Sequence, residues 1–159
     1  MDRIEDRTVG TDGAGGVEDA LERKLCFDVY ATNLAFARLY APLLQPHGLT
    51  YPQYLVLTLL WERDNRTMGE LGEALALGSN TLTPLLKRMA SSGLIGRERD
   101  SHDERRVHVA LAEAGRGLRA ALRHVPDCVE AATGFAEPDI RALQAQLRLV
   151  RVNLRARTS

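Results

Sequence analysis

The residues best suited to chemistry are a cysteine and a group of tyrosines. Cys26 lies near the start of a segment with helical periodicity, and Tyr30 follows it by one turn, within reach of its sulfur. Tyr40 lies about 21 Å from Cys26 along a helix that rises ~1.5 Å per residue, so it cannot contact Cys26 of the same helix. In an antiparallel pair of such helices it could contact Cys26 of the partner. Tyrosine hydroxyls that donate to sulfur favour the thiolate, the reactive form of cysteine.

Both cysteines also have an unreactive interpretation. Cysteine is among the most frequently buried residue types, so Cys26 could be a small buried hydrophobe. Cys128 lies next to Asp127 and near Glu130, and neighbouring carboxylates discourage a thiolate. Taken alone, each position leaves open both a reactive and an inert thiol.

A second group of residues suits DNA contact. Residues 79–91 have apolar side chains on one helical face and short polar or basic side chains on the other. Asn, Ser and Thr reach base edges and phosphates, and Lys and Arg neutralise phosphates, so this helix could lie in a major groove. An ordinary amphipathic surface helix is the alternative. The candidate DNA-binding residues here are Ser79, Asn80, Thr81, Thr83, Lys87 and Arg88.

A β-hairpin is predicted directly after this helix. The hydrophobic period changes from 3.6 to 2 over 94–99 and 106–111, with a polar turn between. An arginine on a protruding hairpin can enter a narrow minor groove, although charge there could instead only protect a sheet edge. A helix-turn-helix followed by a hairpin is the order of a winged helix. The arginines that flank the tip are Arg97, Arg99, Arg105 and Arg106.

The remaining segments must position these residues. Residues 1–17 have no hydrophobic period and are rich in glycine and acidic residues, which predicts a disordered tail. Helical periodicity covers 18–45, Thr50 is expected to cap a buried second helix, and Thr67 with Glu70 forms a capping box. Pro84 is expected to disturb the first turn of the 79–91 helix. Two further helices are predicted over 112–133 and 137–156, with interruptions near Pro126 and Gly134.

Composition excludes several classes of protein. The 159 residues include 45% hydrophobic and 26% charged residues, which fits one globular domain. The 21 basic and 21 acidic residues balance, so total charge does not indicate a nucleic-acid binder. There is no apolar run of membrane length and no secretory signal, and two cysteines are too few for a disulfide framework, so we expect a cytoplasmic protein. Metal-ligand spacing, a Gly-rich phosphate loop and a Ser/His/Asp signature are missing, so we expect neither a metal nor a cofactor.

At this point the residues resemble a known family, the MarR winged-helix regulators. More narrowly they resemble its organic-hydroperoxide-sensing branch, the OhrR regulators. The match covers roughly residues 20–120. The blocks Thr50–Leu55 and Thr81–Arg88 look specific to the branch, whereas Asp103-Glu104-Arg105 in the wing belongs to the wider family. A cysteine with tyrosines 4, 14 and 25 positions on, at Tyr30, Tyr40 and Tyr51, is the sensor pattern.

The resemblance implies a mainly α-helical fold with a small β-hairpin, a winged helix-turn-helix with N- and C-terminal dimerisation helices. Within residues 18–159 it implies dimerisation helices over 18–45 and 112–156 and a DNA-binding lobe over 50–111. The protein would be a homodimeric repressor that binds double-stranded operator DNA, which we expect to be pseudo-palindromic. The wing residues Arg97, Asp103 and Arg105 would contact that DNA.

The resemblance also assigns the chemistry. Cys26 would be the peroxidatic cysteine, surrounded by Tyr30 and by Tyr40 and Tyr51 of the partner subunit. Organic hydroperoxide would oxidise Cys26 and release the operator. Cys128 lies near the resolving cysteine of two-cysteine members, and a small thiol could take its place. Because the thiol reacts once per cycle, the protein would be a sensor and not an enzyme.

Two other functions stay open from the sequence. One is a MarR-type regulator gated by a small aromatic ligand, with Cys26 structural, and the other is a thiol peroxidase. The run Gly78-Ser79-Asn80 departs from the branch, which has an acidic residue and then Ser and a small residue, so the preferred operator could differ.

Overall fold

The computed structural model describes residues 21, 23–101, 103 and 106–157. The expected tail over 1–17 and the wing residue Arg105 lie outside the described residues. The chain forms two compact units, one ending at Leu39 and the other beginning at Tyr40. None of the described helices is both long and apolar enough to cross a membrane.

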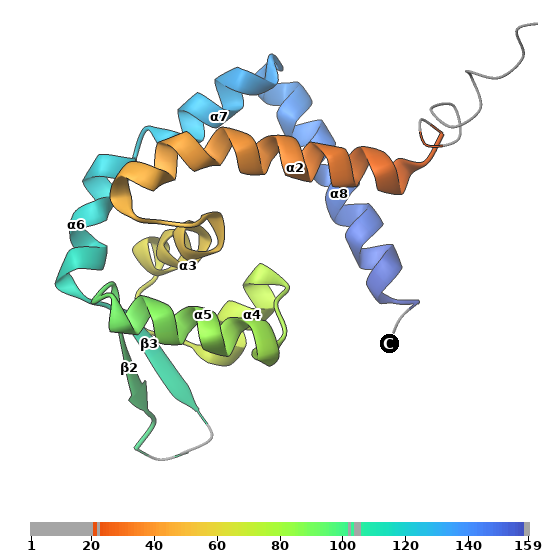
Figure 1. Ribbon diagram of the computed structural model, residues 1–159. Helices are drawn as coiled ribbons and strands as arrows, with labels where there is room; N and C mark the ends of the chain where they lie inside the picture. Colours follow the sequence, from red (N-terminus) through yellow and green to blue (C-terminus); the bar gives the residue numbers. More distant parts are fainter. Residues whose placement is uncertain (1–20, 22, 102, 104–105, 158–159) are drawn as a thin grey trace, which may run out of the picture. The chain divides into compact units, whose positions relative to one another are not determined.

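The described elements are mainly helical, as predicted, with one small antiparallel sheet (Figure 1). They are α2 (Leu25–Leu44), the short 3-10 helix η1 (Gln45–His47), α3 (Tyr51–Glu62), β1 (Arg66–Thr67), α4 (Met68–Leu75), α5 (Ser79–Ser91), β2 (Ile95–Arg99), β3 (Val107–Leu111), α6 (Glu113–Leu122), α7 (Val125–Thr133) and α8 (Glu137–Arg155). The order helix, turn, helix and hairpin confirms the predicted winged helix-turn-helix.

Two helix starts follow directly from local sequence. The backbone N–H of Thr50 donates to Gln53 Oε1 at 2.8 Å, so the N-cap residue of α3 has a hydrogen-bond partner for its backbone donor. At the start of α4 the N–H of Thr67 donates to Glu70 Oε2 at 2.7 Å, and the N–H of Glu70 donates back to Thr67 Oγ1 at 3.2 Å. The capping box predicted at Thr67 is therefore confirmed.

The sheet has the order β1-β3-β2. The predicted hairpin is confirmed, with Ile95 opposite Leu111 and Arg99 opposite Val107. Strand β1 pairs with β3 at Val109 and His108 and was not predicted. Its two residues are too few to show a hydrophobic period, so only tertiary pairing identifies it.

Of three predictions about helix continuity, two need correction and one is confirmed. Arg23 and Lys24 are not helical, so the segment 18–45 is not one continuous helix. The segment 112–133 divides at residues 123–124 into α6 and α7, so the interruption predicted near Pro126 is confirmed. Pro126 stands near the start of α7, where a missing N–H costs little. Helix α5 runs without a break from Ser79 to Ser91 although it contains Pro84, so the expected disturbance of its first turn is wrong.

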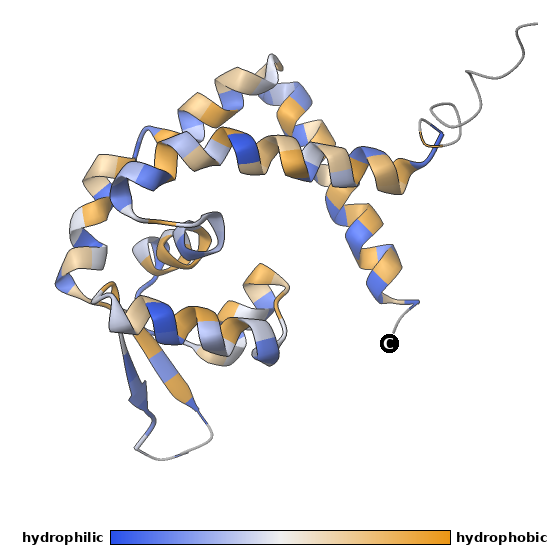
Figure 2. Ribbon diagram, in the orientation of Figure 1, coloured by the Kyte–Doolittle hydropathy of each residue, from blue (hydrophilic) through white to orange (hydrophobic). Residues whose placement is uncertain are grey.

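The hydrophobic core lies between Leu44 and Val129. Helix α3 buries its apolar residues as predicted, with Val56 and Leu57 at 0% exposure. The large apolar side chains that stay exposed in the described part of the chain all lie within 21–34 and 135–154. Helix α8 has no buried residue, and hydrophobic and hydrophilic residues alternate along it (Figure 2). The outer helices therefore hold apolar surface that the described chain does not cover.

Two glycines of α6 give a direct test of this packing. A Cβ at Gly115 would lie 2.1 Å from the backbone oxygen of Leu94, whereas a Cβ at Gly117 would meet nothing within 4 Å. We expect Gly115→Ala to lower the free energy of unfolding by more than about 2 kcal/mol, because backbone must move. Gly117→Ala should raise it by about 0.5–1 kcal/mol, because alanine is the better helix former. Urea denaturation measures both, and equal effects would contradict the contact at Leu94.

Candidate nucleic-acid interface and thiol site

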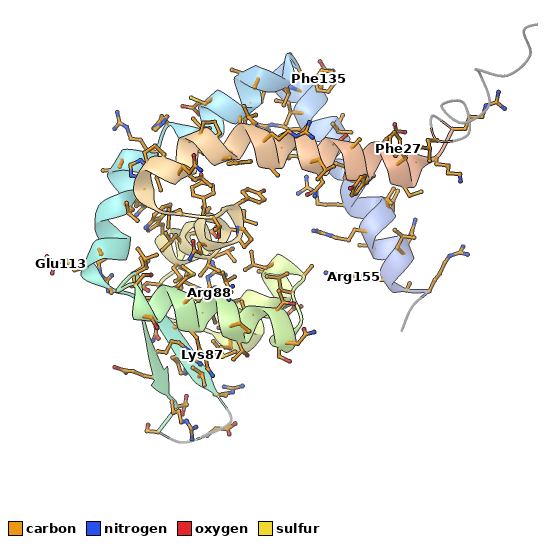
Figure 3. The ribbon with its side chains drawn as sticks, viewed as in Figure 1. Phe27, Lys87, Arg88, Glu113, Phe135 and Arg155 are labelled. Carbon is orange, nitrogen blue, oxygen red and sulfur yellow. The ribbon has the colours of Figure 1, made fainter. Side chains whose placement is uncertain are left out.

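Helix α5 has the two faces that DNA contact requires. Leu82, Leu85, Leu86 and Met89 are 0–5% exposed and attach the helix to the core. The opposite face is open to solvent, and Figure 3 labels Lys87 and Arg88 on it. Of the candidate residues, Thr83 is half-buried, and those exposed are Ser79, Asn80, Thr81, Lys87 and Arg88.

The start of α5 carries no side-chain cap. Gly78 occupies the N-cap position and contributes no side-chain hydrogen bond to the first turn. The first backbone N–H groups of a helix point outward and have no partner within the helix, and they attract anions. This helix end can therefore accept a phosphate oxygen without displacing a cap.

The wing is organised by one carboxylate. Asp100 donates its backbone N–H to the Arg106 carbonyl at 3.0 Å and accepts the N–H of Asp103 on its side chain at 3.2 Å. Its other carboxylate oxygen lies 2.9 Å from Nε2 of His108 on β3. Asp103 itself is exposed. The hairpin extends away from α5, as a wing must (Figure 1).

Arg97 differs from Arg99 and Arg106, which are exposed. Its partner in the register is Val109, which is fully buried, so Arg97 lies on the inner face of the hairpin. Its guanidinium lies 4.0 Å from the Met68 sulfur at the start of α4, and its Nε is buried with no hydrogen-bond partner in the described structure. The structure thus places Arg97 at the base of the wing and not at the tip. An alternating pattern cannot reveal this, because it does not say which face is covered.

Both thiols are free and exposed in the chain. Cys26 is the second residue of α2, and Tyr30 after it is 59% exposed. Cys128 lies on α7. The chain by itself does not bury Cys26, so the interpretation of this residue as a buried hydrophobe has no support within one subunit.

The structure brings two of the predicted tyrosines together. The rings of Tyr40 and Tyr51 have centroids 4.3 Å apart. Tyr54 joins them at 5.9 Å from Tyr40, and Trp61 meets Tyr54 edge-on at 6.2 Å. Tyr54 and Trp61 were not predicted to belong to this group. Their spacing of 3 and 10 from Tyr51 on one helix was the signal that could have included them.

Burial controls the ionisation of these phenols. Burial raises the pKa of Tyr40, and the neighbouring Tyr51 and Tyr54 hydroxyls, a hydrogen bond with Tyr51 and the charge of Glu130 raise it further. Burial also raises the pKa of Tyr54. Both side chains therefore stay protonated at neutral pH and can donate hydrogen bonds to an anion.

Comparison with known proteins gives a consistent result. Residues 38–122 match the family model described as transcriptional regulator SarA/Rot. The chain is 47% identical to the HTH-type transcriptional regulator TtmR of Methylorubrum extorquens (strain PA1), over 87% of this chain and 71% of that protein. It is 42% identical to the organic hydroperoxide resistance transcriptional regulator of Bacillus subtilis (strain 168), over 80% of this chain and 86% of that protein.

Solved structures of AbfR are also similar. The reduced AbfR bound to DNA has a TM-score of 0.72 and 33% identity, covering 86% of this chain and 95% of that one. A disulfide form of AbfR has a TM-score of 0.56 and 34% identity, covering 84% of this chain and 93% of that one. One AbfR structure is from Staphylococcus epidermidis.

The raised pKa of Tyr40 predicts a loss of stability in alkali. An unfolded tyrosine ionises at its ordinary pKa of 10.0, whereas Tyr40 in the folded chain holds its proton to higher pH. The stabilisation is thus complete below about pH 10 and declines as the pH rises further. Tyr40→Phe should lose less stability between neutral pH and high pH than the wild type, measured by urea denaturation. Tyr30→Phe, at an exposed tyrosine, should behave as wild type, and an equal effect of both changes would contradict the prediction.

Proposed function

The chain belongs to the MarR/SarA family of winged-helix, DNA-binding transcriptional regulators, and we propose that it is a homodimeric repressor that senses organic hydroperoxide through Cys26. The observation that carries the proposal is the pairing of Tyr40 with Tyr51 at 4.3 Å, in a chain that leaves the Cys26 thiol exposed. The identity with the Bacillus subtilis organic hydroperoxide regulator supports the same chemistry.

The uncovered apolar surface supports a dimer. Helix α8 has two separate apolar stripes, each with the helical steps of 3 and 4. A stripe on each side allows the helix to pack against two neighbours at once. A single neighbouring helix of the same chain can cover only one of the two stripes. The first stripe consists of Ile140, Leu143, Leu147, Val150 and Leu154, and the second of Ala142, Ala145, Leu149 and Val152.

The sensing step uses the chain's own residues. In the dimer, the phenols of Tyr40 and Tyr51 of one subunit donate hydrogen bonds to Cys26 of the other and stabilise its thiolate. The thiolate sulfur attacks an oxygen of the hydroperoxide, the S–O bond forms and the O–O bond breaks, and the alkoxide takes a proton and leaves as the alcohol. Cys26 is thereby oxidised to sulfenic acid and the hydroperoxide is reduced.

A second thiol completes the cycle. The thiolate of Cys128 from the partner, or of a small thiol, attacks the sulfenic sulfur, forming a disulfide while the oxygen leaves as water. Cys128 attacks second in this scheme, so it need not react with the hydroperoxide itself. Because each thiol reacts once before it is reduced, we propose a sensor rather than an enzyme.

Release of DNA follows from geometry. Two α5 helices of a dimer enter successive major grooves about 34 Å apart, and the wings reach the adjacent minor grooves. A change in the dimer on oxidation alters this spacing, so both halves no longer fit. Arg105 is part of this proposal through its sequence position alone. Asp103, which is exposed on the wing, is also part of it.

Lys87 gives a test of the DNA interface. If it neutralises a phosphate, Lys87→Met should weaken binding to all duplexes about equally and flatten the slope of log Kd against log salt by about one unit per subunit. Lys24 is the chain's other lysine and lies outside α5, so Lys24→Met is the matched control. Fluorescence anisotropy at several salt concentrations measures both variants. An unchanged slope for Lys87→Met would remove this residue from the interface.

Cys26 gives a test of sensing. Cys26→Ser should bind operator DNA like the reduced wild type, because the change is small and lies outside the DNA-binding lobe. It should stay bound after cumene hydroperoxide, which releases the wild type. A gel shift on DNA selected by the reduced wild type measures both states. Release of Cys26→Ser at the wild-type peroxide concentration would exclude Cys26 as the sensor.

The role of Cys128 is tested separately. After cumene hydroperoxide, the wild type should run as a covalent dimer on a non-reducing denaturing gel, and Cys128→Ser should run as a monomer. If the wild type leaves DNA yet stays monomeric on that gel, Cys128 is not the resolving thiol and a small thiol takes this role.

A further inference from the structure

Helix α3 carries two clusters, one at each end. Its first turn supplies Tyr51 and Tyr54, which pack on Tyr40. At the other end of α3, Trp61 lies about 15 Å along the helix axis from Tyr51, at ~1.5 Å per residue, and donates to α6. Asp64, two residues beyond the end of α3, accepts a hydrogen bond from the base of the wing. The rings of Tyr54 and Trp61, 6.2 Å apart, connect the two clusters. Both clusters belong to the unit that begins at Tyr40. The tyrosines take part in the proposed sensing step, whereas that step does not use Trp61 or Asp64.

The Asp64 carboxylate joins three elements. Its Oδ1 accepts the backbone N–H of Leu111, the last residue of β3, at 2.8 Å, and the N–H of Asn65 at 2.8 Å. Its Oδ2 accepts Nη1 of Arg116 on α6 at 2.7 Å. Burial by itself would raise the pKa of Asp64, but these hydrogen bonds and the charge of Arg116 outweigh it and lower the pKa. The carboxylate is therefore ionised at neutral pH, and this contact persists.

Arg116 closes the arrangement from the other side. Its Nη2 donates to the Leu111 carbonyl at 2.8 Å, while its Nη1 donates to Asp64. The ion pair thus holds Leu111 by both its N–H and its C=O. A movement of α3 relative to α6 changes the distance between Asp64 and Arg116. Leu111 at the end of β3 must then move with one of these residues and lose its hydrogen bond with the other.

Trp61 adds a second connection between α3 and α6. Its indole Nε1 donates to the Gly115 carbonyl at 2.9 Å. Gly115 in turn lies against the carbonyl of Leu94, just before β2, and the N–H of Ala112 donates to that same carbonyl at 3.1 Å. Both strands of the wing are therefore anchored at the joint between α3 and α6.

We propose that the Asp64–Arg116 pair is a positioning device that couples the tyrosine end of α3 to the wing. The proposal rests on the proposed function, because it needs oxidation of Cys26 to displace the tyrosines. Tyr51 and Tyr54 move α3, and α3 moves Asp64 through the C-cap Arg63, whose N–H donates to the Leu59 carbonyl. Asp64 with Arg116 then moves Leu111 and the wing. Buried, close-packed helices shift as rigid bodies and not by bending, which lets one end of α3 report on the other.

A purely structural contact would have a different consequence. It would stabilise the wing equally in the reduced and oxidised protein, so its loss would weaken DNA binding by the same factor in both forms. A coupling contact changes the ratio of the two affinities, because the ratio measures the free energy that connects the two sites.

The experiment measures operator affinity before and after oxidation. Kd is determined by fluorescence anisotropy for the reduced protein and for protein treated with cumene hydroperoxide, on a duplex selected by the reduced wild type. Mass spectrometry of Cys26 confirms equal oxidation in each variant. For Asp64→Asn and Arg116→Met we expect a ratio of oxidised to reduced Kd at least about threefold smaller than in the wild type. Two variants from different elements guard against a folding defect in either one.

Arg119→Met is the matched control, because Arg119 is an exposed arginine on the same helix, three residues beyond Arg116. It should keep the wild-type ratio. An unchanged ratio in Asp64→Asn and Arg116→Met, with weaker binding in both states, overturns the coupling and leaves a structural contact. If the oxidised wild type itself keeps its affinity, the proposed sensing function fails, and the coupling fails with it. If only the variants lose the response while Cys26 is oxidised normally, both proposals are supported.

Discussion

Burial of helix α3 is the constraint on which the other elements depend. Val56, Leu57 and Leu60 are at most 1% exposed, and the helix contacts α4, α5, α6 and β3. Each fully buried aliphatic side chain contributes about 1.5–3 kcal/mol relative to an exposed one, so these residues dominate the local energetics. Because α3 is central, α5, the wing and the tyrosines are all positioned relative to this one helix.

The polar groups at the ends of α3 add direction to this packing. Hydrophobic burial is not directional and would tolerate small rotations of α6 or the wing. The Asp64 carboxylate accepts hydrogen bonds from Leu111, Asn65 and Arg116, and such bonds are sensitive to both distance and angle. The joint therefore sets the orientation of the wing relative to α3 and α6, as contact with a groove requires.

Apolar surface is distributed unequally along the chain. The core residues lie between Leu44 and Val129, whereas α8 buries none of its residues. Contiguous exposed apolar surface on a folded protein is typical of an interaction site. A regulator that reads two half-sites needs a second copy. The division into a lobe with a buried core and outer helices with uncovered apolar surface matches the proposed task.

The sequence by itself determined the features that depend on neighbouring residues. The helix start at Thr50, the capping box at Thr67, the apolar face of α5 and the alternating strands of the wing depend on spacings of two to four residues, and each was found in its predicted place. The spacing of Cys26 and the tyrosines is likewise legible in the sequence, where its resemblance to the OhrR regulators indicates a sensor.

Only the tertiary structure decided what depends on distant segments. It added β1, which exists because β3 lies beside it, and it placed Arg97 against Met68 at the base of the wing. It joined Trp61 to Gly115 and Asp64 to Arg116, residues 54 and 52 positions apart, and it added Tyr54 to the tyrosine group. Local periodicity states which face of an element is apolar, but not which element covers it. That choice is made by the packing of the whole chain, and it determines which polar side chains meet.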